Sequence, residues 1–332
     1  MQPELPYVEL EAAADEIGGL WQQLAGRRVM VTGGTGFIGK WLVGTFLVAN
    51  RKFELDARID IITRSSARLS DFRDESLSFV TGDVRSFQSS QAPDFIIHAA
   101  TPVHNSTEDG IELLDLLGSG TANTLRHAEK PGFQRSLLLS SGAVYGPQPA
   151  GLAGFPETWR GEIDWLAHGA AYAQGKRQTE AMSLLHARRH GYPLRCARGF
   201  AFTGPGQPLD PRFAISSLFA DALHGRSAQL RCGGLRRSYL YAADLAVWLW
   251  TYLLLPHAPE FLNVGSDQAV TLDQLAVLVA EICGAPPPAA AEDMRQGSDY
   301  IPDISTARAL GLRVSTPLDQ SIFKTWSHHG RR

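Results

Sequence analysis

Short β-branched apolar runs alternate with longer helix-like patterns over roughly the first half of the chain. The runs predict five strands, at residues 29–32, 59–63, 79–84, 95–101 and 136–141. Between them, residues 41–50 and 120–125 carry helical patterns. Strands that alternate with helices in this way form a parallel sheet covered on both faces. The pattern therefore predicts an α/β fold with a doubly wound parallel sheet.

Three glycines follow the first strand at the spacing G-x-x-G-x-x-G, namely Gly33, Gly36 and Gly39. A glycine lets the backbone turn sharply, approach a pyrophosphate, or pack a helix closely on a strand. The helix that follows would direct its N–H groups and the positive end of its dipole at phosphates. Glycines also gather in turns that bind nothing, but their place between a first strand and a helix favours dinucleotide binding. We therefore predict a Rossmann-type domain.

The alternation of strands and helices loosens after about residue 200. Three prolines between residues 205 and 211 mark a loop, and helices are expected over residues 213–223 and 272–282. Residues 8–25, in front of the first strand, carry an amphipathic helical pattern to which we assign no chemistry. The expected parts are an N-terminal helical extension (1–26), an NAD(P)-binding Rossmann domain (27–200 and 238–264) and a smaller α/β substrate-binding lobe (201–237 and 265–332).

Composition and charge narrow the class of protein. An apolar fraction of 44% is ordinary for a globular chain, and a net charge of -3 offers no basic surface for nucleic acid. The most apolar run, residues 245–255, is shorter than the roughly 20 residues of a membrane span. Residues 1–28 lack the apolar segment of a secretory signal. Cys196, Cys232 and Cys283 are sparse and lack metal-ligand spacing, so we expect reduced thiols, no metal and a cytoplasmic location.

Polar and small residues stand where the predicted strands end, which is where ligands bind in a parallel sheet. The second strand ends at Arg64, and arginine suits the 2′-phosphate of NADP, whereas an acidic residue would bind the ribose hydroxyl of NAD. A solvated loop arginine is the alternative, so both cofactors stay open and NADP is modestly favoured. The third strand leads to Asp83, placed to meet an adenine, and the fourth leads to Ala99 and Ala100. His98 on that strand is expected to be a core residue.

Tyr172 and Lys176 stand four residues apart in a helical pattern, so they face the same way. A tyrosine has an ordinary pKa of about 10 and is a poor base at neutral pH. A neighbouring ammonium favours the phenolate, so we expect Lys176 to lower the pKa of Tyr172. Ser141, at the end of the fifth strand, can donate a hydrogen bond to the same substrate oxygen. Such a pair is common by chance, but after a glycine-rich turn it indicates a catalytic set of Ser141, Tyr172 and Lys176.

These motifs together resemble the extended short-chain dehydrogenase/reductase superfamily, and within it the nucleotide-sugar epimerase/dehydratase group. The resemblance rests on residues 32–39, residues 140–146 and the Tyr-x-x-x-Lys pair, and it extends from residue 27 to about residue 325. It implies that Tyr172 is the acid/base, that Lys176 binds the nicotinamide ribose and that Ser141 holds the sugar hydroxyl. It also implies that Arg237 and Arg295 clamp the diphosphate of a nucleotide sugar. The expected cofactor site comprises Gly33, Gly36, Phe37, Ile38, Gly39, Arg64, Asp83, Val84, Ala99, Ala100, Tyr172 and Lys176.

Two departures from the group bear on substrate and reaction. Ala201 stands where many relatives have an asparagine, and Gly142 and Ala143 stand where dehydratases and decarboxylases of the group carry acidic residues. We expect an epimerase that transfers hydride at a sugar carbon, C4, of a nucleotide-activated hexose, without 4,6-dehydratase activity. An NADPH-dependent ketosugar reductase and a non-catalytic nucleotide-sensing protein are the alternatives. The expected partners are the nucleotide sugar and a second copy of the chain in a homodimer, with no nucleic acid and no membrane.

Overall fold

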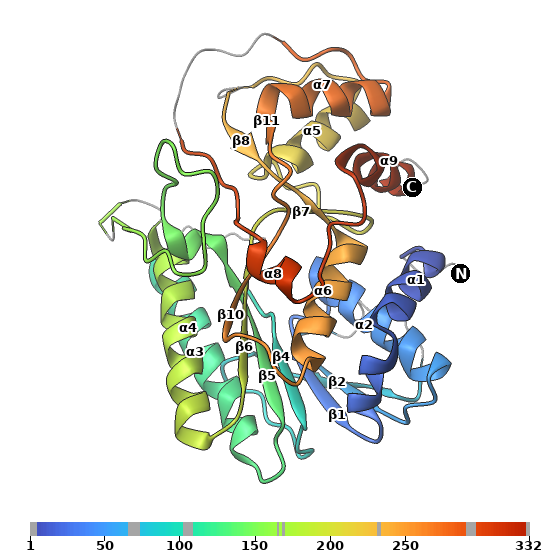
Figure 1. Cartoon of the computed structure of the whole chain (residues 1–332), viewed down its shortest axis with the longest axis vertical. Coiled ribbons are helices and arrows are strands. Elements are labelled where there is room, and N and C mark those ends of the chain that lie inside the picture. The colour runs from blue at the N-terminus through green and yellow to red at the C-terminus, as the bar shows by residue number, and fades with distance from the viewer. Residues whose placement is uncertain are drawn as a thin grey trace. The chain divides into compact units, whose positions relative to one another are not determined.

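The computed structural model describes residues 5–65, 74–101, 109–164, 166–167, 170–230, 234–289 and 297–329 (Figure 1). The chain forms two compact units. The first contains Met1–Gly146, Ile163–Gly199 and Ala246–Leu262, and the second contains Pro147–Glu162, Phe200–Leu245 and Asn263–Arg332. The predicted substrate residue Arg295 lies outside the described residues.

A seven-stranded sheet forms the centre of the first unit. Its strands, in spatial order, are β10 (Phe261–Val264), β6 (Leu194–Gly199), β5 (Arg135–Ser141), β4 (Phe95–His98), β1 (Arg28–Thr32), β2 (Arg58–Thr63) and β3 (Leu77–Thr81). The pairs from β6 to β3 are all parallel. The chain adds β2 and β3 on one side of β1 and then restarts with β4 on the other side. The strand order therefore reverses between β1 and β4, which is where such sheets bind ligands, and the predicted doubly wound sheet is confirmed.

Helices cover both faces of this sheet (Figure 1). α3 (Gly110–Arg126) and α4 (Ala170–His190) pack together on one face, and α2 (Phe37–Lys52) and α6 (Ala242–Leu254) lie on the other. Because both faces are covered, β1 is apolar on both sides, and Val29, Met30 and Val31 are all fully buried. The most apolar run of the sequence lies in α6, whose Trp250 donates a hydrogen bond to the Leu42 carbonyl of α2 at 3.1 Å.

The N-terminal extension is an extra helical layer packed on α2. The sequence pattern predicts one helix over 8–25, but the structure has α1 (Tyr7–Ile17) followed by a 3₁₀ helix, η1 (Gly18–Leu24). The change occurs at Gly18, whose φ of 56° favours glycine and ends the α-helical hydrogen bonding. Trp21 is buried with its ring 5.1 Å from that of Trp250, and such burial stabilises by roughly 1.5–3 kcal/mol per large side chain. Glu11 and Asp15 of α1 form ion pairs with Lys52 of α2, at 3.3 and 2.8 Å.

The second unit combines short strands with helices. It contains β7 (Phe202–Thr203) paired with β9 (Leu240–Tyr241), β8 (Arg236–Arg237) paired with β11 (Val270–Thr271), α5 (Ala214–Leu223), α7 (Leu272–Cys283), α8 (Ser305–Ala309) and α9 (Leu318–His329). α5 and α7 confirm the two predicted helices, and α7 ends at Gly284 in the left-handed conformation, with φ 66°. Apolar side chains of α5, α7 and α9, including Phe219, Leu275 and Ile322, form its core.

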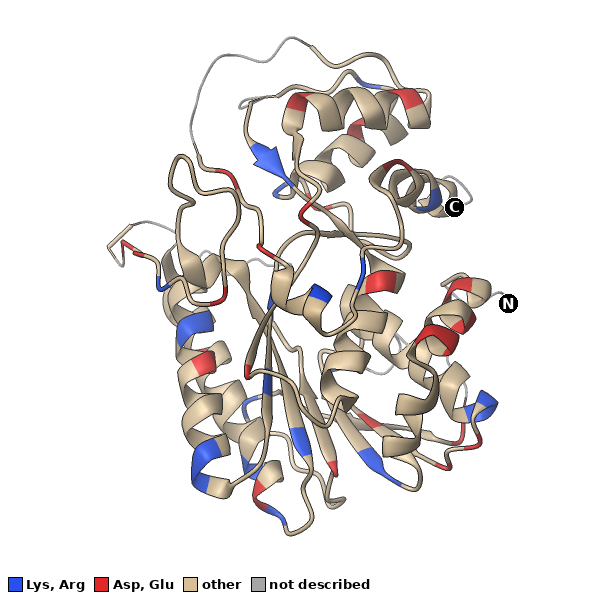
Figure 2. Ribbon diagram, viewed as in Figure 1, with Lys and Arg blue, Asp and Glu red and all other residues tan. Residues whose placement is uncertain are grey.

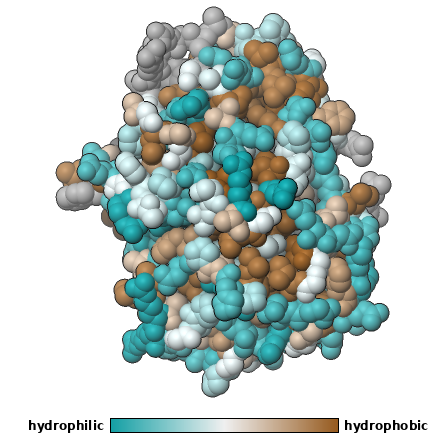
Figure 3. All heavy atoms as spheres, in the orientation of Figure 1, coloured by the Kyte–Doolittle hydropathy of each residue, from teal (hydrophilic) through white to brown (hydrophobic). Residues whose placement is uncertain are grey.

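Charged residues of both signs occur along the part of the chain that the structure describes. Lys and Arg are interspersed with Asp and Glu along the ribbon (Figure 2). On the face seen in Figure 3, polar and apolar residues are mixed. None of the helices in the described ranges combines the length and the apolar character that a membrane span requires.

Candidate active site

The turn between β1 and α2 needs its glycines for different reasons. Gly33 has φ 76°, and a Cβ there would lie 2.5 Å from the Ala99 carbonyl oxygen. A Cβ on Gly39 would collide with the Gly33 carbonyl oxygen and lie 2.5 Å from the Cα of Gly34. Gly36 has φ -80° and ψ 175°, which any residue can adopt, and a Cβ there would meet only the Gly33 oxygen at 3.3 Å. The backbone packing therefore requires glycine at positions 33 and 39. At position 36 the packing leaves open space where a side chain could otherwise lie.

That open space lies at the start of α2, and it suits a pyrophosphate. Gly36 is the N-cap residue, and no side chain caps the helix there. The first N–H groups of a helix have no partner within it, and the helix dipole favours a negative charge at this end. Phe37 and Ile38 supply the first helical N–H groups. The predicted cofactor therefore fits the residues present at this turn.

β4 ends beside the same turn. The N–H groups of Ala99 and Ala100 donate to the Thr32 carbonyl at 3.1 Å and to the Thr32 hydroxyl at 3.2 Å. The ring nitrogens of His98 lie 2.7 Å from the Thr32 hydroxyl and 3.1 Å from the Thr121 hydroxyl. Burial, with the charge of Lys176 as a second cause, lowers the pKa of His98 to about 3. His98 is therefore a neutral core residue, as the sequence predicted.

Arg64 and Asp83 follow the ends of β2 and β3. Both oxygens of Asp83 accept hydrogen bonds from the Arg85 guanidinium at 2.9 Å. These bonds, and to a smaller extent the charge of the exposed Arg64, lower the pKa of the Asp83 carboxyl. The carbonyl of Val84 accepts from the side-chain amide of Asn123 at 3.1 Å. Arg64 and Asp83 thus influence each other at one edge of the sheet, and their contacts with cofactor stay predictions.

β5 and α4 bring the three predicted catalytic side chains together. Ser141 is the last residue of β5, and Tyr172 and Lys176 lie in the first two turns of α4. Ser141 accepts a hydrogen bond from the N–H of Ala143 at 3.1 Å, and its hydroxyl lies close enough to the Tyr172 hydroxyl to favour the phenolate. The Nζ of Lys176 lies 6.0 Å from the centre of the Tyr172 ring. The structure therefore brings the serine and the lysine near the same tyrosine.

The pKa of Tyr172 is raised, which corrects the expectation that Lys176 lowers it. Burial disfavours the phenolate by more than the hydrogen bond with Ser141 favours it. The ammonium of Lys176 donates instead to the Thr101 hydroxyl at 2.7 Å and to the Leu139 carbonyl at 2.8 Å. Burial lowers the pKa of Lys176 to about 8, so the ammonium form predominates at pH 7. Tyr172 is thus a phenol in this structure and is ready to donate a proton.

A buried polar network that the sequence analysis missed supports this set. Glu180 stands one turn after Lys176 on α4 and forms an ion pair with Arg198 of β6 at 2.7 Å. Glu180 also accepts from the hydroxyl of Ser140 at 2.6 Å, and Arg198 donates to the Tyr145 hydroxyl at 3.0 Å. Glu180 lies eight residues after Tyr172 and four after Lys176. This helical spacing is the signal by which the sequence could have placed Glu180 near the catalytic set. Its partner could be found only from the fold.

The predicted substrate arginine Arg237 lies on β8 of the second unit. It is half-buried, and its Nη1 donates to the carbonyls of Arg236 and Ser298, both at 2.8 Å. Arg236 forms an ion pair with Asp299 at 2.7 Å, so its charge is balanced locally. The role of Arg237 in binding a diphosphate stays a prediction.

A glycine turn at the switch point of a parallel sheet, with Ser141 at the end of β5 and Tyr172 and Lys176 on α4, is typical of a nicotinamide-dependent enzyme of the extended short-chain dehydrogenase/reductase type. The family model described as the NAD dependent epimerase/dehydratase family matches residues 29–265, which is most of the chain. The protein therefore belongs to this NAD-dependent family.

Relatives with three different reactions resemble the chain. UDP-glucuronic acid decarboxylase 3 of Arabidopsis thaliana is 28% identical over 264 residues, covering 77% of this chain and 74% of the relative. The dTDP-4-dehydro-6-deoxy-D-allose reductase of Streptomyces bikiniensis is 27% identical over 279 residues, covering 79% and 83%. UDP-glucose 4-epimerase of Thermus thermophilus, solved in complex with NAD, has a TM-score of 0.74 at 22% identity, covering 91% of this chain and 98% of that one. This last likeness supports the fold.

Proposed function

We propose that the protein is a nucleotide-sugar epimerase that moves hydride at C4 of a nucleotide-activated hexose. The observation that carries the proposal is the grouping of Ser141, at the end of β5, with Tyr172 and Lys176 of α4, at the edge of the sheet where the glycine turn fits a dinucleotide. When bound, the nicotinamide would supply the acceptor and donor of the hydride. Epimerisation requires that the same nicotinamide return the hydride to the opposite face of the sugar within one turnover.

The side chains divide the proton transfer between them. Ser141 would hold the sugar oxygen, and Tyr172 would take the hydroxyl proton as hydride leaves the same carbon and return it in the second half of the reaction. Lys176 would bind the nicotinamide ribose, with its ammonium 6.0 Å from the centre of the Tyr172 ring. The test is turnover of UDP-, dTDP-, CDP- and GDP-hexoses followed by NMR, with mass spectrometry of any ligand carried through purification. Failure of Tyr172→Phe to abolish turnover would remove Tyr172 from this role.

A ketosugar reductase is the second candidate, and two observations favour it. Arg64 stands at the end of β2, where arginine suits the 2′-phosphate of NADPH. Tyr172 is in the phenol form, which is the form that donates a proton to a ketone oxygen during reduction. Titration with NADPH and NADH distinguishes the two cofactors, and Arg64→Ala should erase most of any preference for NADPH. Tighter binding of NADH by the native protein would instead support an epimerase that retains NAD.

Elimination of water from a 4-ketosugar is not expected. Such elimination needs an acid for the departing hydroxyl and a base for the C5 proton, and the turn after Ser141 supplies only Gly142 and Ala143. The Glu157 carboxylate accepts hydrogen bonds from the N–H of Asn263 and the hydroxyl of Thr306, each at 3.0 Å. Asp164 accepts from a backbone N–H in its own loop. A product lighter by one water, formed in a Tyr172-dependent manner, would contradict this reasoning.

A non-catalytic nucleotide sensor is the third candidate, and the intact set of Ser141, Tyr172 and Lys176 counts against it.

We also propose that Arg237 and Arg295 bind the substrate diphosphate. The variant Arg237→Ala tests this role, because loss of a phosphate contact should raise the KM for the nucleotide sugar. We also propose a homodimer, in which the exposed side chain of Leu185 on α4 would be covered by the second copy. Light scattering of Leu185→Glu, which should be monomeric, tests the dimer. The sparse cysteines support a cytoplasmic location, which imaging of a tagged protein tests.

A further inference from the structure

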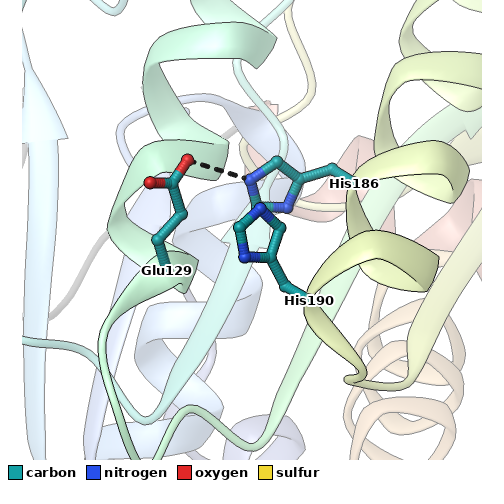
Figure 4. Close-up of side chains that lie close together, drawn as sticks. All are labelled: Glu129, His186 and His190. Atoms are coloured by element: carbon teal, nitrogen blue, oxygen red, sulfur yellow. Dashed lines mark hydrogen bonds and ion pairs between the residues drawn. The ribbon is translucent and has the colours of Figure 1, made fainter.

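Three potential metal ligands meet at the end of α4 (Figure 4). His186 and His190 are four residues apart, so they share one face of the last turns of the helix. Glu129 comes from η3 (His127–Glu129), the 3₁₀ helix that follows α3. One ligand atom from each residue lies within 4.8 Å of the others. At 1.5 Å per residue, His186 lies about 21 Å along α4 from Tyr172, so this cluster is separate from the candidate active site.

The spacing of the cluster suits a metal ion. The Nε2 of His186 lies 3.3 Å from a carboxylate oxygen of Glu129 (Figure 4). Two ligands that each bind tetrahedral zinc at roughly 2.0–2.1 Å are about 3.3–3.4 Å apart, so this pair is already at ligand spacing. The His190 ring stacks on that of His186 with centroids 4.2 Å apart. Because His190 is exposed, its ring can turn toward the ion without repacking of the core.

Tyr192 orients His186 from the other side of the ring. The Nδ1 of His186 lies 2.8 Å from the Tyr192 hydroxyl. A phenol hydroxyl can both donate and accept a hydrogen bond, so it can partner this nitrogen in either protonation state of the ring atom. In the metal-free protein the ring would donate from Nε2 to Glu129. With an ion on Nε2 the ring proton would move to Nδ1 and be donated to the phenol oxygen. Metal-binding histidines usually make such a bond with their second nitrogen.

We propose that Glu129, His186 and His190 bind a divalent transition-metal ion, for which zinc is the natural probe. Two imidazole nitrogens and a carboxylate oxygen form a set that zinc accepts, with water as the fourth ligand. The ion would tie the end of α3 to the end of α4, and its role would be structural. The sequence predicted no metal from its sparse cysteines, and the signal that it does contain is His-x-x-x-His, at the end of α4.

The first experiment measures stoichiometry and affinity. The full chain is stripped with EDTA, and zinc is titrated in competition with a chromophoric chelator. We expect one zinc equivalent per chain, and a Kd at least tenfold weaker in His190→Ala, in Glu129→Gln and in their double variant. The matched control is His224→Ala with His257→Ala, which removes two exposed histidines elsewhere and should keep the equivalent. Equal zinc binding by the native chain and the double variant would overturn the proposal.

A second measurement separates a built site from scattered surface binding. Cobalt(II) in a site with two histidines and a carboxylate should give d–d absorption in the native chain and the control, but not in His190→Ala. Zinc should also raise the Tm of the native chain in proportion to the logarithm of its concentration and leave the Tm of His190→Ala unchanged. His190 is exposed, so this variant should fold. An identical Tm response in the two proteins would also contradict the site.

Discussion

The buried ion pair between Glu180 and Arg198 makes a sharp test of how β5, β6 and α4 hold the catalytic residues. Glu180 accepts two hydrogen bonds from Arg198, at 2.7 and 2.9 Å, and one from Ser140 at 2.6 Å. Each charged side chain is 8% exposed. Glu180→Gln preserves the shape but leaves the Arg198 charge facing a neutral amide. Removing one partner of a buried ion pair typically costs about 3–5 kcal/mol.

That loss is large against the roughly 5–15 kcal/mol by which a domain is stable. In a unit of about 200 residues, each kcal/mol of lost stability lowers the Tm by about 2–4 °C. The expected loss of about 3–5 kcal/mol should therefore lower the Tm of Glu180→Gln by about 6–20 °C. Urea and thermal unfolding, followed by circular dichroism, measure it. Glu260→Gln is the matched control, because the Arg188–Glu260 pair is exposed and 3.5 Å long. Loss of this exposed ion pair should lower the free energy of unfolding by less than about 1 kcal/mol.

A double variant tests the physical cause. Glu180→Met with Arg198→Met removes both charges, and apolar replacement of a buried pair is often neutral or stabilising. The double variant should therefore be more stable than Glu180→Gln. A single variant within about 1 kcal/mol of the native protein would refute the reasoning. A double variant as unstable as the sum of both single variants would show that an unbalanced buried charge is not the cause.

Three further predictions follow from the site. Tyr172→Phe should keep cofactor affinity and lose roughly 10²–10⁴-fold in turnover, measured by steady-state kinetics; near-native turnover would contradict the acid/base role. Gly36→Ala and the larger Gly36→Val should fold but bind dinucleotide weakly in calorimetry, whereas Gly39→Ala should lose stability because its Cβ meets backbone. Normal cofactor binding by a folded Gly36→Val would remove this turn from the site. The folded pKa of His98, about 3, is below its unfolded value of about 6.5, so its contribution to stability is complete above pH 6.5 and falls with pH toward 3. By pH 5 the native chain should lose about 2 kcal/mol more than His98→Gln in urea unfolding, and parallel pH profiles would contradict this.

Local sequence patterns determined the fold class and most of the candidate site. A parallel strand buried on both faces needs an apolar run. The turn after β1 needs glycine at positions where a Cβ meets backbone, and two residues four apart on a helix share a face. These requirements act within a few residues, so they are visible without the fold. The predicted strands, α5, α7 and the grouping of Ser141, Tyr172 and Lys176 follow from them.

Only the tertiary structure decided which distant groups meet and how deeply they are buried. Arg198 is the partner of Glu180, and Glu129 reaches His186 across 57 residues of sequence. The direction of the Tyr172 pKa depends on whether burial or a neighbouring charge has the larger effect. Its sign was predicted wrongly because helical spacing gives the presence of Lys176 but says nothing of desolvation. Burial and distance are properties of the packed chain, since they depend on every segment that surrounds a group.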